Sequence, residues 1–153
     1  MKEIKNQRFG EERALYGIED ACIINCRFEG EEDGESALKE GRNFELKECY
    51  MDLRYPLWHD DSVLLDKVTM TENCRAALWY THNVEIKNSH LLGIKALREC
   101  GEIQIQNTEI VSPEFGWRSK NITAENIQVQ GEYLFFEAKN LKLKNMNFRG
   151  KYS

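Results

Sequence analysis

His59, Asp60 and Asp61 form the densest group of titratable side chains in this 153-residue chain. An imidazole beside carboxylates is suited to proton transfer, because histidine titrates near neutral pH. Paired carboxylates can hydrolyse a glycosidic bond, and a guanidinium such as that of Arg54 or Arg75 can serve as the base of a lyase acting on uronate. We therefore take His59, Asp60, Arg54 and Arg75 as candidate catalytic residues. The alternative is that these charged side chains form structural ion pairs.

All three tryptophans fall at equivalent points of a sequence repeat, and cations share their position. The set, taken as a candidate ligand-binding stripe, is Lys39, Trp58, Trp79, Arg98, Trp117 and Phe136, with Tyr16 at its start. The residue before most of them is leucine, so alternation predicts that the stripe faces outward or lies at a bend. Stacked aromatic rings with interleaved cations suit the binding of sugar rings. The alternative is a self-stabilising ladder with cation–π contacts, or a surface covered by a partner.

Composition excludes several other kinds of protein. The net charge of −5 argues against a nucleic-acid-binding surface, and no apolar run is long enough to span a membrane. Met1 is not followed by a secretory leader, so we expect a cytoplasmic protein with five reduced cysteines, of which Cys26 and Cys49 have packing roles. The acidic segment Glu29–Glu35 lacks EF-hand spacing, which favours a solvated loop over a calcium site. We expect no metal and no cofactor.

A repeat with the pattern Asn-Φ-x-Φ-x-Asn, in which Φ is apolar, must position all these residues. Its second apolar position recurs through the chain, and five of the seven spacings are 19 residues. These marker positions are Ile4, Ile23, Leu46, Leu65, Ile86, Ile105, Ala124 and Leu143. A second apolar column follows five residues later, and a third contains Leu57, Leu78 and Leu97. Insertions of four and two residues explain the two longer spacings.

Segments of three to five residues with period-two alternation predict strands rather than helices. Three short strands and three bends per repeat describe a parallel β-helix. We predict an all-β fold, a single-stranded right-handed parallel β-helix (solenoid) of about seven to eight coils of ~19 residues. Two residues after the marker, six of eight positions are Asn, which tolerates a left-handed bend and can form hydrogen-bonded ladders between coils.

Five phrases of the sequence carry a resemblance to a known family: Glu12–Gly17, Gly34–Glu40, Leu53–Asp60, Cys74–Tyr80 and Gly93–Cys100. They resemble an uncharacterised bacterial family, domain of unknown function 3737, in the pectate-lyase-like (pectin lyase-like) class. The resemblance covers essentially the whole chain and implies the right-handed β-helix. It implies no activity, because the family has none assigned. Family members are longer, so we expect residues 1–153 to be one domain that is incomplete at its C-terminus.

The ends of such a rod expose backbone donors, backbone acceptors and core side chains. The first coil begins almost at Met1, and the last stops partway round, so we expect a homo-oligomer through the ends of the β-helix. Our leading functional hypothesis is a non-catalytic binding or assembly module that presents the stripe. The alternative is a carbohydrate-binding or carbohydrate-active protein, similar to a polysaccharide lyase or hydrolase, that uses the same face. Whether the protein is an enzyme stays open at this point.

Overall fold

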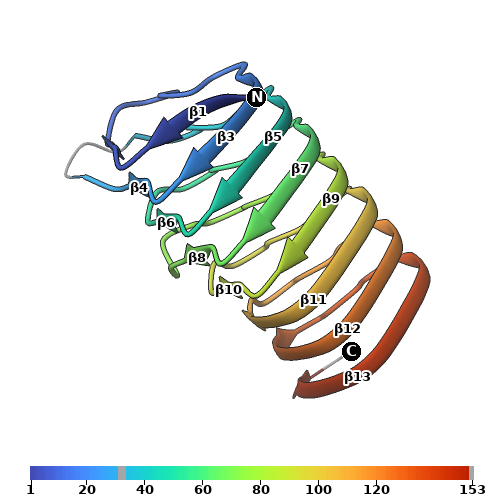
Figure 1. Cartoon of the computed structure of the whole chain (residues 1–153). Helices are drawn as coiled ribbons and strands as arrows, with labels where there is room; N and C mark the ends of the chain where they lie inside the picture. The colour runs from blue at the N-terminus through green and yellow to red at the C-terminus, as the bar shows by residue number, and fades with distance from the viewer. Residues whose placement is uncertain (31–33, 152–153) are drawn as a thin grey trace.

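The computed structural model describes residues 1–30 and 34–151, and this part of the chain contains thirteen strands and no helix. Successive coils stack into a rod, and every strand pair is parallel (Figure 1). One row of strands consists of β1 (Lys2–Lys5), β3 (Glu19–Ile24), β5 (Arg42–Lys47), β7 (Asp61–Asp66), β9 (His82–Lys87), β11 (Gly101–Val111), β12 (Lys120–Glu132) and β13 (Lys139–Lys151). The shorter row consists of β2 (Arg8–Phe9), β4 (Arg27–Phe28), β6 (Tyr50–Met51), β8 (Thr69–Met70) and β10 (His90–Leu91). This architecture confirms a parallel β-helix of about eight coils, whereas the right-handed sense stays a prediction.

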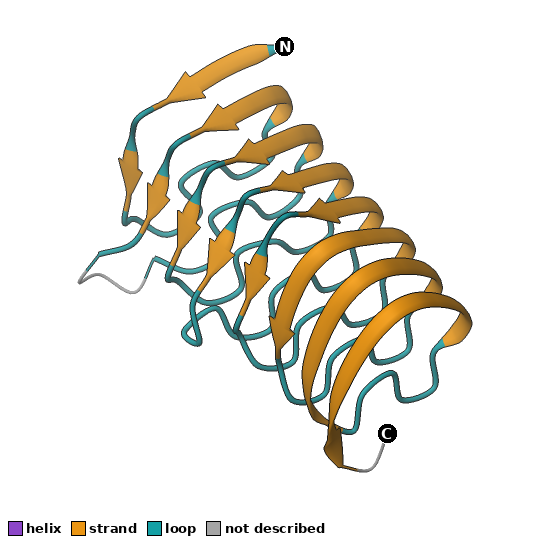
Figure 2. Cartoon of the chain, turned by 60° about the horizontal axis from the view of Figure 1, so that its bottom comes forward, coloured by secondary structure: helices purple, strands orange, loops and turns teal. Residues whose placement is uncertain are grey.

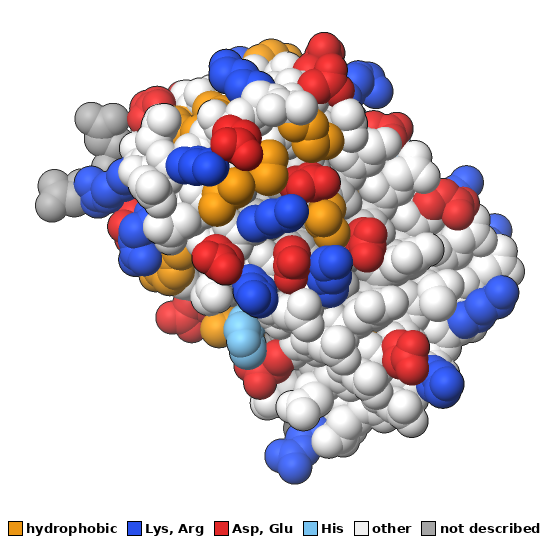
Figure 3. Space-filling view, in the orientation of Figure 1, with side chains coloured by type: hydrophobic (Ala, Val, Ile, Leu, Met, Phe, Trp, Pro, Cys, Tyr) orange, Lys and Arg blue, Asp and Glu red, His pale blue; other side chains and the backbone are white. Residues whose placement is uncertain are grey.

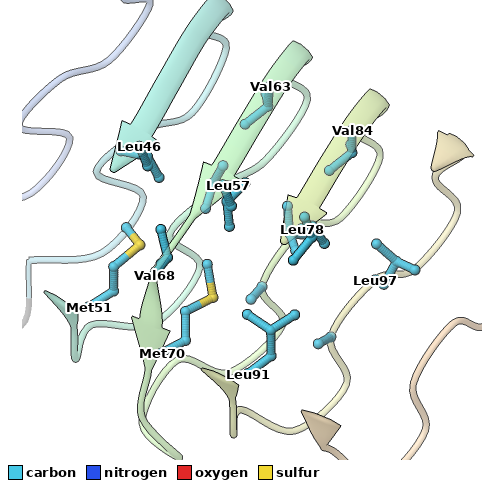
Figure 4. Packing of buried hydrophobic residues seen from close by; sticks show 14 of the residues in the cluster. Leu46, Met51, Leu57, Val63, Val68, Met70, Leu78, Val84, Leu91 and Leu97 are labelled. Carbon is cyan, nitrogen blue, oxygen red and sulfur yellow. The ribbon is translucent and has the colours of Figure 1, made fainter. Parts of the chain in front are cut away.

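The strand register agrees with the predicted apolar columns. Ile4 pairs with Ile23, and Ile86 pairs with Ile105, so consecutive marker residues lie side by side. The second column is also in register, with Met51 opposite Met70. Figure 4 shows side chains of these columns packed between the walls of the coil. Each repeat therefore contributes the same few inward side chains to one continuous core. A coil buries its apolar side chains only by packing against its neighbours.

The predicted asparagine column forms a left-handed bend in every coil. The backbone φ angle is 56° at Asn6 and 53° at Asn88, and Glu48 and Lys67 adopt the same conformation at 54° and 56°. In β11, β12 and β13 the ladder continues through this bend, which makes the long curved strands visible in Figure 2. The side-chain ladder is present as well, since the Asn25 amide donates to the oxygen of Asn6 at 2.8 Å.

The third side of each coil differs from the expected strand. Leucines of the third column, such as Leu57 and Leu78, are buried there. Among the described residues, however, the pairing on this side consists of isolated β-bridges from Trp58 to Trp79 and from Trp79 to Arg98 rather than of a strand. Alternate residues of the segment have positive φ angles: 51° at Ala76, 59° at Leu78 and 55° at Tyr80. A segment in which every second residue is left-handed cannot form a regular extended strand. This wall is therefore a series of bends, held together by backbone hydrogen bonds between coils.

Small polar side chains line part of the interior and satisfy the backbone. The Thr81 hydroxyl donates to the Trp79 carbonyl at 3.1 Å, and the Ser119 hydroxyl donates to the Trp117 carbonyl at 3.3 Å. Cys49 makes the equivalent bond to the carbonyl two residues before it. All five cysteines are free and buried, as the packing role predicted for Cys26 and Cys49 requires. Within the described residues no helix is long and apolar enough to cross a membrane.

Candidate functional site

The predicted stripe forms a continuous aromatic ladder along the third side of the rod. The rings of Trp58 and Trp79 stack with centroids 5.1 Å apart and planes 17° apart. The Arg98 guanidinium lies 4.9 Å from the Trp79 ring and 6.0 Å from the Trp117 ring. Trp117 in turn packs against Phe136, with centroids 5.0 Å apart. We call these five residues the aromatic ladder.

Hydrogen bonds between coils fix the tilt of the ladder. The indole N–H of Trp58 donates to the Ala76 carbonyl at 2.8 Å, and that of Trp79 donates to the Lys95 carbonyl at 2.6 Å. Each indole therefore ties its own coil to the next one. Because the ring is held by its nitrogen and stacked on its neighbour, it has little freedom to turn.

This geometry decides which part of each ring meets solvent. Trp58 and Trp79 are half-buried, and their facing surfaces cover each other. Stacking on a sugar needs an open ring face, whereas the ring faces between Trp58 and Trp79 are closed to a ligand. Lys39, on the coil before Trp58, is also half-buried. The role of the stripe in binding stays a prediction, and any contact that it makes would be through edges and through the exposed ring of Phe136.

The candidate catalytic residues do not converge on one point. The exposed His59 ring stacks on Tyr80 at 4.9 Å, whereas Asp60 is 2% exposed and belongs to the interior. Arg54 pairs with Glu35 at 3.4 Å on another bend. Arg75 is exposed. Among the described residues no hydrogen bond or ion pair joins the members of this set to one another, so their assignment to catalysis rests on residue type alone.

Asp60 occupies the same inward column as Thr81, Cys100 and Ser119. One of its oxygens, Oδ1, accepts the backbone N–H of Gly41 at 2.6 Å, and the other, Oδ2, is buried without a hydrogen-bond partner. The pKa of this carboxyl is raised to about 8, mainly by burial and also by the nearby charge of Glu40, against the lowering effect of the backbone bonds from Gly41 and Trp58. Asp60 is therefore mainly a neutral carboxylic acid at pH 7.

The structure gives no support to a metal centre in the part of the chain that it describes. Residues 1–30 and 34–151 contain no group of three or more His, Cys, Asp or Glu side chains arranged to hold a metal ion. The middle of the acidic segment, for which we predicted a solvated loop rather than a calcium site, lies at 31–33, outside the described residues.

A groove lies on another wall of the rod. It has a volume of about 1030 Å³ and crosses β5, β7, β9, β11, β12 and β13. Its side chains are mostly amides, hydroxyls and carboxylates: Asn43, Glu45, Ser62, Asn83, Glu85, Glu102, Gln104, Asn121, Thr123, Asn140 and Lys142. We call it the amide groove. Figure 3 shows that the surface over β11 to β13 is mainly neutral and polar, in contrast to the apolar and charged surface over the earlier coils.

A second ladder of asparagines forms one wall of the amide groove. Asn121 donates to Glu102 at 2.6 Å, and Asn140 donates to Asn121 at 2.9 Å. These residues adopt left-handed conformations, with φ angles of 57° at both asparagines. The bend therefore places them beside the outward side chains of the strands, such as Gln104 and Thr123. Each coil that lines the groove contributes side chains from the same two positions of the repeat, and all of these side chains except Leu64 are polar.

Sequence reasoning missed this groove although its signal was present. Two positions of the motif Asn-Φ-x-Φ supply side chains to the groove. The Asn lines one wall, and the residue at x lines the other. Asn83 and Glu85 are one such pair. For the second Asn of the motif we predict a bend and a hydrogen-bonded ladder, and we assign no role to the first Asn. The sequence pattern does not predict a groove between the Asn and x positions, because the shape of the surface there depends on the backbone angles at the bend.

Comparison with known proteins identifies a family but no activity. A solved structure of QnrB1, a plasmid-mediated fluoroquinolone resistance protein, is 13% identical; the alignment covers 96% of this chain and 89% of that chain, with a TM-score of 0.29. A likeness this distant carries no argument about function. Comparison with curated proteins gives no match, and the pectate-lyase-like class stays a prediction. Residues 2–153 match the family described as protein of unknown function (DUF3737). Because that match spans almost the entire sequence, the chain belongs to the DUF3737 family.

Proposed function

We propose that this protein is a non-catalytic binding module whose ligand is an extended, hydroxyl-rich polymer, in chemical terms an oligosaccharide, that lies in the amide groove. The observation that carries the proposal is the groove itself, which crosses six strands of the longer row and is lined in each coil by side chains from the same two positions of the repeat. Parallel strands are ~4.8 Å apart, which is comparable to the length of one sugar unit in an extended chain. A linear ligand can therefore meet side chains at equivalent positions of the repeat in each coil.

The chemistry of the lining supports a sugar over an apolar ligand. Amide and hydroxyl side chains such as Gln104 and Thr123 both donate and accept hydrogen bonds, as sugar hydroxyls do. Both side chains point outward from strands and are exposed. The side chains of Val84 and Ile103 are turned into the core, so the apolar contacts that the groove offers come mainly from Leu64 and Leu141. The stripe that we first assigned to ligand binding has its ring faces largely covered, which makes the amide groove the better candidate.

A matched pair of variants tests the proposal. Gln104→Ala removes a groove amide, whereas Gln106→Ala removes an exposed amide from the same strand outside the groove. Binding of neutral and acidic oligosaccharides would be measured on a glycan array and then by calorimetry. We expect Gln104→Ala to weaken binding about fivefold or more, as loss of a hydrogen bond in a binding site does, and Gln106→Ala to have no effect. Absence of binding to every glycan, or equal effects of both variants, would contradict the proposal.

Self-association is a second candidate function, and the last strand carries the observation that favours it. Leu141, Leu143 and Phe148 of β13 are 36%, 41% and 40% exposed, although they occupy the columns that are buried in earlier coils. Pairing of β13 with a second copy would cover them. Light scattering tests this: we expect a dimer or larger species, and Leu143→Lys to shift it toward the monomer. A monomer at all concentrations would refute self-association.

A further inference from the structure

The column of residues that begins with Glu19 runs beside the amide groove and ends in two lysines, Lys120 and Lys139. They lie opposite each other in neighbouring strands with no acidic residue between them in the column. In the early coils the same column alternates in charge, with Glu19 opposite Arg42 and Arg42 opposite Asp61. On β12 and β13 it places Lys120 directly opposite Lys139. Like charges at directly opposed positions of a sheet are destabilising. The structure gives neither ammonium group an ion-pair partner among the residues that it describes.

These lysines border a hollow and adjoin residues of the groove in the sequence. An open hollow of about 540 Å³ is lined by Lys120, Lys139 and the Arg118–Glu137 ion pair. Lys120 and Lys139 each directly precede an asparagine of the groove wall, and Lys142 lies in the groove itself. The side chain of Lys120 extends over Gly101, since a methyl group at Gly101 would lie 3.5 Å from its Cε. Lys142 therefore lies at the β13 end of the amide groove, and Lys120 and Lys139 each lie one residue from an asparagine that lines it.

The other part of the groove has the opposite charge. Glu85 and Glu102 line it, and Glu45 lines it while pairing with Lys47 at 3.3 Å. A polymer with a carboxylate on every sugar would bring negative charge next to these glutamates, which costs binding energy. A neutral chain avoids this repulsion. The groove thus favours negative charge at its lysine end alone.

We propose that Lys120, Lys139 and Lys142 bind an anionic group, and that the ligand of the amide groove is a largely neutral oligosaccharide with one acidic group at its end. This inference rests on the proposed function and adds the charge and the direction of the ligand. The anion would relieve the repulsion between Lys120 and Lys139. Since these side chains are exposed, the effect decreases as salt screens the charges.

The test compares neutral hexasaccharides with the same sugars oxidised at the reducing end, which places one carboxylate at one terminus. Cello-, malto- and chito-oligomers form the panel, and a hexagalacturonate is the fully acidic probe. Calorimetry at low salt should show the singly acidic form binding about tenfold tighter than its neutral parent. The double variant Lys120→Gln/Lys139→Gln should reduce this ratio to about one. Lys144→Gln, on the same strand but paired with Glu125, should leave it unchanged.

The possible failures are distinguishable. Equal binding of neutral and singly acidic forms would overturn the inference and leave the proposed function standing. Tighter binding of hexagalacturonate than of the singly acidic probe would also overturn it, because the glutamates would then not exclude charge. A ratio that survives in the double variant would place the anion elsewhere. Binding of no probe at all would count against the proposed function and the inference together.

Discussion

Asp60→Asn replaces a buried carboxyl group with a neutral group of the same shape. The wild-type carboxyl has a pKa of about 8 in the folded protein, whereas the ordinary value for aspartate is 3.8. Between these two values the folded state holds a proton that the unfolded state has released. The free energy of unfolding therefore falls as pH rises, by about 1.4 kcal/mol per pH unit. Over the whole interval the loss is on the order of 5 kcal/mol.

The asparagine variant has no such dependence at this position. Its amide oxygen can accept the Gly41 N–H, and its amide nitrogen can donate to a carbonyl, as the Thr81 hydroxyl does in the next coil. We expect the variant to match the wild type within about 1 kcal/mol near pH 4, and to exceed its stability by several kcal/mol at pH 8 to 9. Urea unfolding at each pH, followed by tryptophan fluorescence, gives the difference between the two proteins.

Asp61→Asn is a matched control with the opposite sign. The pKa of Asp61 is lowered, mainly because the Asn83 amide donates to its carboxylate. Its contribution to stability is therefore present above the ordinary pKa and is lost as pH falls through the lowered one. This variant should be less stable than the wild type at pH 7, and the difference should shrink in acid. A constant difference between Asp60→Asn and the wild type across pH 4 to 9 would refute the buried neutral acid.

Further predictions concern the ladder, the bends and the thiols. Trp79→Ala removes a half-buried ring that packs against Trp58 and Arg98, and should lower the free energy of unfolding by roughly 2–3 kcal/mol. Phe136→Ala, at a ring that is 47% exposed, should lower it by less than about 1 kcal/mol. Equal losses in the two variants would contradict the role of stacking. Asn88→Ala should be about 1 kcal/mol less stable than Asn88→Gly, because glycine accepts the φ of 53° without strain; thermal unfolding would show it, and equal melting temperatures would speak against left-handed strain at this bend. Burial raises the pKa of the thiols of Cys74 and Cys100 to about 12, so both should stay unreactive toward a disulfide reagent at pH 8 until urea unfolds the chain; rapid labelling of the folded protein would show that they are accessible.

The sequence by itself determined the coil and its register. In a solenoid each residue meets its equivalent in the next coil, so a period of 19 residues already specifies which side chains pair. Ile86 lies opposite Ile105 for this reason, and the asparagines of the repeat form the bend and the ladder that their residue type predicts. The single column of the tryptophans was predictable in the same way, since Trp58 and Trp79 are bridged across neighbouring coils.

Only the tertiary structure decided which way several side chains point and where the surface is hollow. A left-handed residue interrupts the alternation of inward and outward positions, so His59, with a φ of 53°, leaves Asp60 inside although both are polar. The same bends replace the expected third strand. The amide groove is lined by the left-handed residue Asn121 together with the strand residue Thr123, and the lysine pair matters because β12 and β13 stack in register. These features depend on the backbone angles at the bends. The period of the apolar residues does not determine those angles.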